Sequence, residues 1–211
     1  MANSFDEERE PAEVETVAQL AANVVWRLPG CDDEAVRRAL QSAFADFCRG
    51  SCALTAVRRV EVGPRDSVCE LCVSPSREGR FVDCVKGVRK DSRDLVQGRD
   101  YSIRDGLVVF RHPFAGPCVL FVTTVEQPVD GSESAPSWFL KKYGRAIESG
   151  ALARLMSMTG RAWSDPQQAR MEAVSFNDHV TQAKLAYYNG GDMTNGSASA
   201  FVGRHDPGGL L

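Results

Sequence analysis

The sequence predicts an α+β fold: a bundle of about four helices, a small antiparallel β region inserted between the second and third helices, and an extended C-terminal tail. Two stretches of helical period flank a middle stretch in which apolar residues alternate with polar ones. The chain after the last helical stretch is rich in glycine and serine. We therefore expect a flexible arm over residues 1–12, the bundle over 13–54 and 135–190, the β region over 55–130 and the tail over 191–211.

The composition is that of an average folded chain. The 211 residues are 43% hydrophobic and 25% charged, which suits either one generous domain or a core with one small satellite and requires no disulfides. A net charge of -3 argues against a free-standing nucleic-acid binder. Seven cysteines, an odd number, and no apolar signal-like start favour a reducing cytosol. The apolar runs are too short for a membrane span, so we expect neither secretion nor membrane insertion.

The first part of the bundle is predicted as an antiparallel helix pair. Apolar residues recur every three or four positions from Val14 to Val24, which places them on one helix face. The turn 28–30 ends that helix, and Asp32 is positioned to cap a second one. The buried face of this second helix is expected to consist of Val36, Leu40, Phe44 and Phe47.

The middle of the chain is predicted to form short strands. Alternating apolar residues between Ala56 and Val129 are separated by turns rich in glycine, proline and charge. Tyr101–Phe110 is predicted as a hairpin, because its central Asp105-Gly106 supplies the positive φ that a tight turn needs. A further strand is expected over residues 119–125, and the local connections favour antiparallel pairing.

Two long helices are predicted to complete the bundle. Ser137 is expected to cap the first, and Asp165, followed by Pro166, is expected to cap the second. The buried line of the first is expected to contain Tyr143, Ile147, Ala151, Leu155 and Met158. The buried line of the second is expected to contain Ala169, Ala173, Phe176, Val180, Ala183 and Tyr187.

The cysteines offer one alternative function, a zinc-binding interaction module. Cys69 and Cys72 have the spacing of half a zinc site, and Cys48 and Cys52 could supply two more thiolates. Cys69 and Cys72 lie, however, in an alternating run, where residues three apart point to opposite faces of a strand. We therefore favour buried structural cysteines and expect no bound metal.

Enzyme chemistry is not indicated by any sequence motif. The three histidines lack a neighbouring nucleophile or ligand, and no phosphate-binding glycine loop or nucleophile elbow is present. We expect a protein that is not an enzyme and needs no cofactor. A cleft that gathers cysteine, histidine and acidic side chains would instead favour a small cytosolic enzyme.

Three stretches carry a family resemblance. They are the turn 28–31 with the helix that follows it, the hairpin from Tyr101 to Leu107, and residues 146–155 together with Trp163, Asp165-Pro166 and Phe176. With the order helix, helix, β insertion, helix, helix and tail, the chain resembles the head-to-tail adaptor (connector) proteins of tailed bacteriophages, including the tail tubular protein A group. The resemblance covers most of residues 14–188.

The resemblance implies a structural virion protein that is made in the host cytoplasm and located at the neck of the capsid vertex. It implies a homo-oligomeric ring, a dodecamer, that joins the portal protein to a tail or nozzle (head-closure) protein, with DNA only as a passenger in the channel. Helices would pack side to side between subunits, and the small-residue face suited to this comprises Tyr143, Gly144, Ile147, Gly150 and Ala151. The tail would dock on the portal through Phe201, Val202, Arg204, His205, Leu210 and Leu211.

Overall fold

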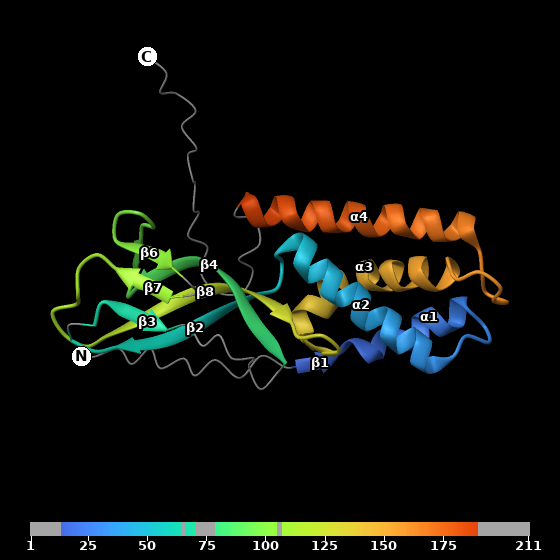
Figure 1. The fold of residues 1–211 in the computed structure, drawn as a ribbon, viewed down its shortest axis with the longest axis horizontal. Helices are drawn as coiled ribbons and strands as arrows, with labels where there is room; N and C mark the ends of the chain where they lie inside the picture. The colour runs from blue at the N-terminus through green and yellow to red at the C-terminus, as the bar shows by residue number, and fades with distance from the viewer. Residues whose placement is uncertain (1–13, 65, 71–78, 105–106, 190–211) are drawn as a thin grey trace, which may run out of the picture.

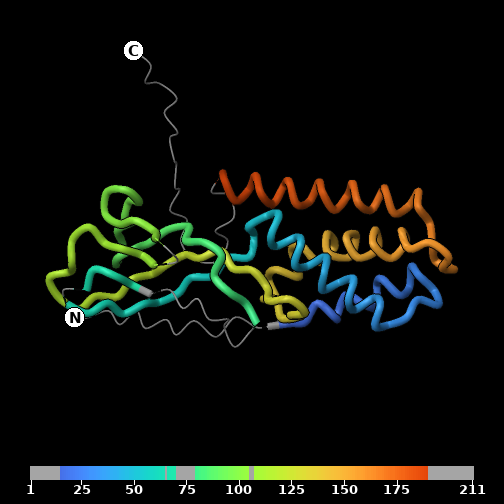
Figure 2. Tube along the Cα trace, in the orientation of Figure 1, coloured from blue at the N-terminus to red at the C-terminus, as the bar shows by residue number. Residues whose placement is uncertain are grey.

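In a computed structural model the chain folds into a helical part and a β part, each with its own hydrophobic core (Figure 1). The structure describes residues 14–64, 66–70, 79–104 and 107–189. The helices lie at one end and the larger sheets at the other, so the molecule is elongated (Figure 2).

The helical part is built around one central helix. Thirteen residues of α3 are buried, and this helix packs against α2 on one side and α4 on another. A short 3-10 helix, η1, and helix α1 cover the remaining side. The elements are η1 (Val17–Leu20), α1 (Ala21–Arg27), α2 (Asp33–Ser51), α3 (Ser137–Met156) and α4 (Pro166–Tyr188).

Two of the three predicted helix caps are confirmed. The Asp32 carboxylate accepts a hydrogen bond of 3.1 Å from the backbone of Ala35 at the start of α2. Asp165 accepts bonds of 3.1 and 3.0 Å from the first turn of α4. The predicted Ser137 cap is wrong, because Pro136 occupies the cap position and Ser137 is already helical. Met158, expected on the buried line of α3, lies beyond the helix and is 42% exposed.

The β part consists of two antiparallel sheets, and a third, two-stranded sheet lies beside the bundle. The four-stranded sheet has the order β2-β8-β4-β5, and the three-stranded sheet has the order β3-β7-β6. In the third sheet, β1 pairs with β9. The strands are β1 (Val14–Thr16), β2 (Thr55–Val62), β3 (Val68–Glu70), β4 (Arg80–Lys90), β5 (Arg93–Leu95), β6 (Tyr101–Arg104), β7 (Leu107–Phe110), β8 (Cys118–Pro128) and β9 (Ser134–Pro136).

Antiparallel pairing agrees with the expectation, and the predicted hairpin is confirmed. Strands β6 and β7 pair from Tyr101 opposite Phe110 to Arg104 opposite Leu107. The longest strands, β4 and β8, form the centre of the larger sheet. The register of β4 against β8 shifts twice, between Val82 and Cys84 and between Val85 and Gly87.

The predicted fold class is wrong in its proportions. About 30% of the described residues are in strands, which is too much for a four-helix bundle with a small β insertion. The β part also has a core of its own, which a small insertion would not need. The buried members of this core are Val62, Cys69, Val85, Val88, Tyr101, Val108, Phe110, Leu120 and Val122.

The first predicted helix is also corrected. The segment from Val14 to Val24, expected as one helix, is divided among β1, η1 and the start of α1. Pairing of β1 with β9 satisfies the backbone of residues 14–16, and the Thr16 hydroxyl accepts a bond of 3.2 Å from Ala18 at the start of η1. A long-range strand pairing therefore overrides the local helical spacing.

The helical and β parts are joined by direct contacts. Cys52, with φ 55°, ends α2 and turns the chain into β2. The backbone of Glu126 in β8 donates a bond of 2.8 Å to the carbonyl of Leu54, which belongs to the helical core. Nζ of Lys86 in β4 donates to the Tyr187 carbonyl at 3.2 Å and lies 4.2 Å from the Tyr187 ring centre. The two contacts of Lys86 with Tyr187 hold the end of α4 against the larger sheet.

Candidate assembly surfaces

Helix α4 lies along the outside of the bundle (Figure 1). Several of its apolar side chains are exposed. Only three of its residues are buried, against thirteen in α3. On its outer face Met171 and Val174 are each 60% exposed, Leu185 is 55% exposed and Tyr188 is 66% exposed. Exposed Asp178 and Thr181 lie between these two apolar pairs. We call these six residues the α4 stripe.

The spacing of the α4 stripe is that of a packing seam. Its positions, 171, 174, 178, 181, 185 and 188, are separated alternately by three and four residues. This repeat keeps side chains on one helix face and is the one used where helices pack in coiled coils. A face of this kind, apolar at both ends, is typical of a surface that another chain segment covers.

The sequence pattern does not identify the α4 stripe as an exposed face, because α4 carries apolar residues on two faces. The predicted face is the one that packs inward: Ala169 and Ala183 are buried, and Phe176 and Val180 pack against the helical core. The second set shows the same helical spacing, so periodicity alone does not tell which face is buried. Small side chains at 169, 173 and 183 are the distinguishing signal, because they allow α3 to approach closely.

A second exposed feature is Trp26 near the end of α1. Its side chain is 85% exposed, more than any other large apolar side chain among the described residues. The helix beneath it is fixed on both sides: Asn23 donates a bond of 2.7 Å to Glu148 of α3, and Arg27 forms an ion pair with Glu172 of α4. Trp26 is therefore presented to solvent on a positioned helix.

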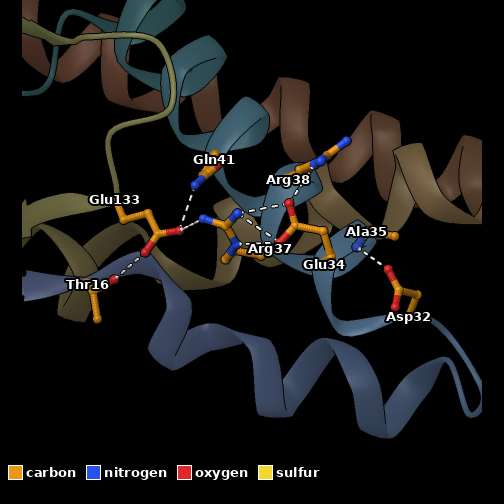
Figure 3. A network of polar contacts seen from close by, with 8 residues as sticks. All are labelled: Thr16, Asp32, Glu34, Ala35, Arg37, Arg38, Gln41 and Glu133. Carbon is orange, nitrogen blue, oxygen red and sulfur yellow. Dashed lines mark hydrogen bonds and ion pairs between the residues drawn. The ribbon is translucent and has the colours of Figure 1, made fainter.

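A polar network holds the N-terminal segment against α2 (Figure 3). Oε1 of Glu133 accepts bonds of 2.9 Å from Arg37 and 2.6 Å from Gln41, and its Oε2 accepts a bond of 3.4 Å from the Thr16 hydroxyl. Arg37 also binds Glu34 at 2.9 Å. The Glu133 carboxylate is thus bound by three side chains of two elements, α2 and β1, and holds these elements together.

Two open depressions lie in the described surface. One of about 560 Å³ lies beside Glu133, with Glu15, Thr16 and Gln19 in its lining. The other, of about 370 Å³, lies between α2, α3 and α4, where Arg154 pairs with Asp46 and lies 5.8 Å from the Phe176 ring centre. Neither lining contains cysteine or histidine, so within the described surface these depressions do not form the cleft expected of the enzyme alternative.

The residues expected to pack between subunits are used within one chain. Tyr143, Gly144, Ile147, Gly150 and Ala151 are all buried in the helical part. A Cβ on Gly150 would lie 2.7 Å from the Phe176 ring, and a Cβ on Gly144 would lie 3.3 Å from Leu20. The small residues of α3 thus allow its own neighbours to approach, and the uncovered helix surface lies on α4.

Among the described cysteines of the zinc hypothesis, Cys48 and Cys52 lie at the end of α2, whereas Cys69 lies in β3. Cys48 belongs to the helical core and Cys69 to the β core, and Cys72 lies outside the described residues. Burial raises the pKa of the Cys48 thiol well above its ordinary value, which disfavours the thiolate that a metal needs. Within the described ranges no group of three or more His, Cys, Asp or Glu side chains is arranged to hold a metal ion.

The remaining predicted site lies in the tail. Phe201, Val202, Arg204, His205, Leu210 and Leu211 are outside the described residues. No protein-family model and no curated protein sequence matches this chain. None of the helices in the described residues is both long and apolar enough to cross a membrane.

Proposed function

We propose that this protein is a structural assembly protein of a tailed bacteriophage, a head-to-tail adaptor that forms a ring between the portal and the tail. The observation that carries the proposal is the α4 stripe. Four large apolar side chains on one helix, each more than half exposed, provide a surface for a neighbouring subunit. The proposed partners, the portal and the tail, are inferred from the order of elements, which resembles that of the adaptor family.

The elongated shape supports a connecting role. The helical part lies at one end and the larger sheets at the other, so one subunit offers two separate surfaces along its length (Figure 2). The contacts between α4 and β4 through Tyr187 and Lys86 couple these two parts. In the proposed ring, the helices pack laterally, the tail docks on the portal, and the β part reaches the tail machinery or a neighbouring subunit.

The channel of an adaptor must contact the DNA only weakly. DNA must slide through an adaptor, and every phosphate bound by a basic side chain adds affinity that opposes sliding. A chain with net charge -3 suits a channel that lets DNA pass. We therefore propose DNA as a passenger and not as a ligand.

Imaging of assembled particles tests the proposal directly. We expect a ring of this chain beneath the portal, with α4 at the contact between subunits and twelve copies per vertex, the number implied by the family resemblance. A chain located elsewhere in the particle, or absent from it, would contradict the proposal. Deleting residues 192–211 is expected to leave the helical part folded and to abolish attachment to the portal.

A matched pair of variants tests the lateral surface. Val174→Glu introduces a charge at the α4 stripe and is expected to prevent ring formation on the portal. Val57→Glu makes the same change at a valine of β2 that is 50% exposed, and we expect it to leave the ring intact. Equal incorporation of both variants into particles would show that the α4 stripe is not the subunit contact.

A further inference from the structure

In a subunit that has not entered a ring, the α4 stripe has no neighbouring subunit to cover it. Its order along α4 is apolar, acidic, apolar: Met171 and Val174, then Asp178, then Leu185 and Tyr188. All of these side chains are exposed in the described part of the chain. The question is which segment has the complementary order.

The tail has a similar order, apolar, charged, apolar: Phe201-Val202, then Arg204, His205 and Asp206, then Leu210-Leu211. Within its charged part, Arg204 supplies a charge opposite to that of Asp178. We propose that in the free subunit residues 201–211 fold back antiparallel to α4 and cover the α4 stripe, with Arg204 facing Asp178. The proposal rests on the adaptor function only in taking ring formation as the event that later displaces the tail.

The dimensions of the two segments agree. With a rise of about 1.5 Å per residue, the centres of the two apolar pairs on α4 are roughly 21 Å apart. An extended chain covers about 3.3 Å per residue, so residues 201–211 reach at most roughly 33 Å and span that distance with slack. In an extended segment Val202 and Arg204 lie on the same face, about 7 Å apart, and Asp178 lies roughly 10 Å along α4 from Leu185, so the long Arg204 side chain reaches Asp178 when Val202 lies at Leu185.

The connection permits the reversal of direction. Helix α4 ends at Tyr188, and Gly190-Gly191 lack the side chains that restrict a sharp turn. Residues 190–200 reach about 36 Å when extended, more than a return to Leu185 requires. A tether of this length holds the segment at an effective concentration on the order of millimolar, so a weak contact is sufficient.

The contact would couple two steps of assembly. The tail residues that cover the α4 stripe are the same ones that the proposed function assigns to portal docking. A free subunit with its tail on α4 therefore presents neither its lateral surface nor its docking segment. When a neighbouring subunit displaces the tail from α4, the tail becomes available to the portal, so the lateral contact and portal docking are coupled.

Proteolysis of the full-length chain tests the contact without a portal or a particle. We would measure the rate of tryptic cleavage after Arg204 by mass spectrometry and compare it with the rate for a synthetic peptide of residues 190–211. The intact protein is expected to be cleaved at least about tenfold more slowly than the peptide. Val174→Glu and Leu185→Glu should each bring the rate to within about twofold of the peptide, whereas Val57→Glu should remain protected.

A charge exchange tests the predicted register. Asp178→Arg should accelerate chymotryptic cleavage after Phe201, and the additional change Arg204→Asp should restore the protection. Circular dichroism checks that each variant keeps its helices. If Arg204→Asp does not restore the protection from chymotrypsin in the Asp178→Arg variant, the pairing of Arg204 with Asp178 is refuted.

Two outcomes would overturn the inference as a whole. The first is a wild-type chain that is cleaved as fast as the peptide, or a rate unchanged by Val174→Glu. The second is protection that increases with protein concentration, because it would show that another copy covers the α4 stripe. That second outcome would leave the adaptor proposal standing, since a lateral contact between subunits is what the adaptor needs.

Discussion

Nη1 of Arg80 donates a hydrogen bond of 3.2 Å to Oε2 of Glu126, and both residues are buried where the larger sheet meets the helical part. Oε1 of the same carboxylate accepts a bond of 2.7 Å from Arg58. Burial lowers the pKa of the Arg80 guanidinium, and the charge of Glu126 acts in the opposite direction. One carboxylate thus stabilises two cations at the junction of the helical and β parts.

Glu126→Gln is expected to destabilise the protein by about 3 kcal/mol, because it removes the buried carboxylate that the guanidinium groups of Arg58 and Arg80 share. Urea unfolding measures the change in free energy of unfolding. Glu61→Gln is the matched control, since Glu61 forms an exposed ion pair with Arg59 at 3.3 Å that is worth less than about 1 kcal/mol. Similar losses in both variants would show that the junction cluster has no special role.

Two glycines of α3 give opposite predictions for the same substitution. Gly150→Ala places a methyl group between the Phe176 ring, 2.7 Å away, and Ala43, 3.0 Å away, and we expect a loss of about 1–3 kcal/mol from overpacking. Gly144→Ala faces a half-buried Leu20 methyl at 3.3 Å that can move, so the gain in helix propensity should give about 0.5–1 kcal/mol of stabilisation. Thermal unfolding distinguishes the two. Stabilisation by Gly150→Ala would mean that α3 and α4 are less closely packed than described.

The parts of the fold that local signals determine could be predicted from the sequence. The caps at Asp32 and Asp165 and the Tyr101–Phe110 hairpin depend on residues a few positions apart. The extent of the β part could not be predicted. Strand β8 pairs with both β2 and β4, and the bulges in β4 interrupt the alternation that would have marked it as one long strand.

The sites were harder to predict than the fold, for two physical reasons. The buried cluster joins Arg58, Arg80 and Glu126, which are far apart in the sequence and belong to residue types that are rarely buried. The α4 stripe has a visible spacing, but α4 carries two apolar faces and only tertiary packing selects one. Phe176 packs against Gly150 of α3, and Met171 and Val174 of the same helix are exposed.

Acid is expected to weaken the contact between α1 and α4. Burial raises the pKa of Glu172, but hydrogen bonds from Arg27, Ser149 and Gln168 outweigh it, and the pKa lies below its usual value. The Glu172 carboxyl therefore binds a proton more tightly in the unfolded chain than in the folded protein. Its stabilising effect is fully present above the ordinary glutamate pKa of about 4.3. The effect is lost as the pH falls through the lower pKa that Glu172 has in the folded protein.

The measurement for this contact is the free energy of unfolding from pH 7 to pH 3, with Glu172→Gln as the variant. We expect the wild type to exceed the variant by about 1–3 kcal/mol at pH 7 and the difference to shrink below about pH 4. Glu148→Gln, which alters the neighbouring contact with Asn23, serves as the control. A difference for Glu172→Gln that stays constant down to pH 3 would contradict the assigned pKa direction.

Cys84 and Cys48 are expected to differ in their reactivity toward a thiol-labelling reagent. Cys84 is exposed on β4, yet partial desolvation, together with the charge of Asp83 and the neighbouring Cys52, raises its thiol pKa. Because the thiolate is the reactive form, Cys84 should react with iodoacetamide more slowly than free cysteine at pH 7.5 and gain rate as the pH rises above 9. Asp83→Asn should accelerate the reaction by removing a negative charge, and Cys48, buried in the helical core, should react only after unfolding. Peptide mapping separates the sites, and labelling of Cys48 in the folded protein at the rate of Cys84 would show that α2 opens away from α3 in solution.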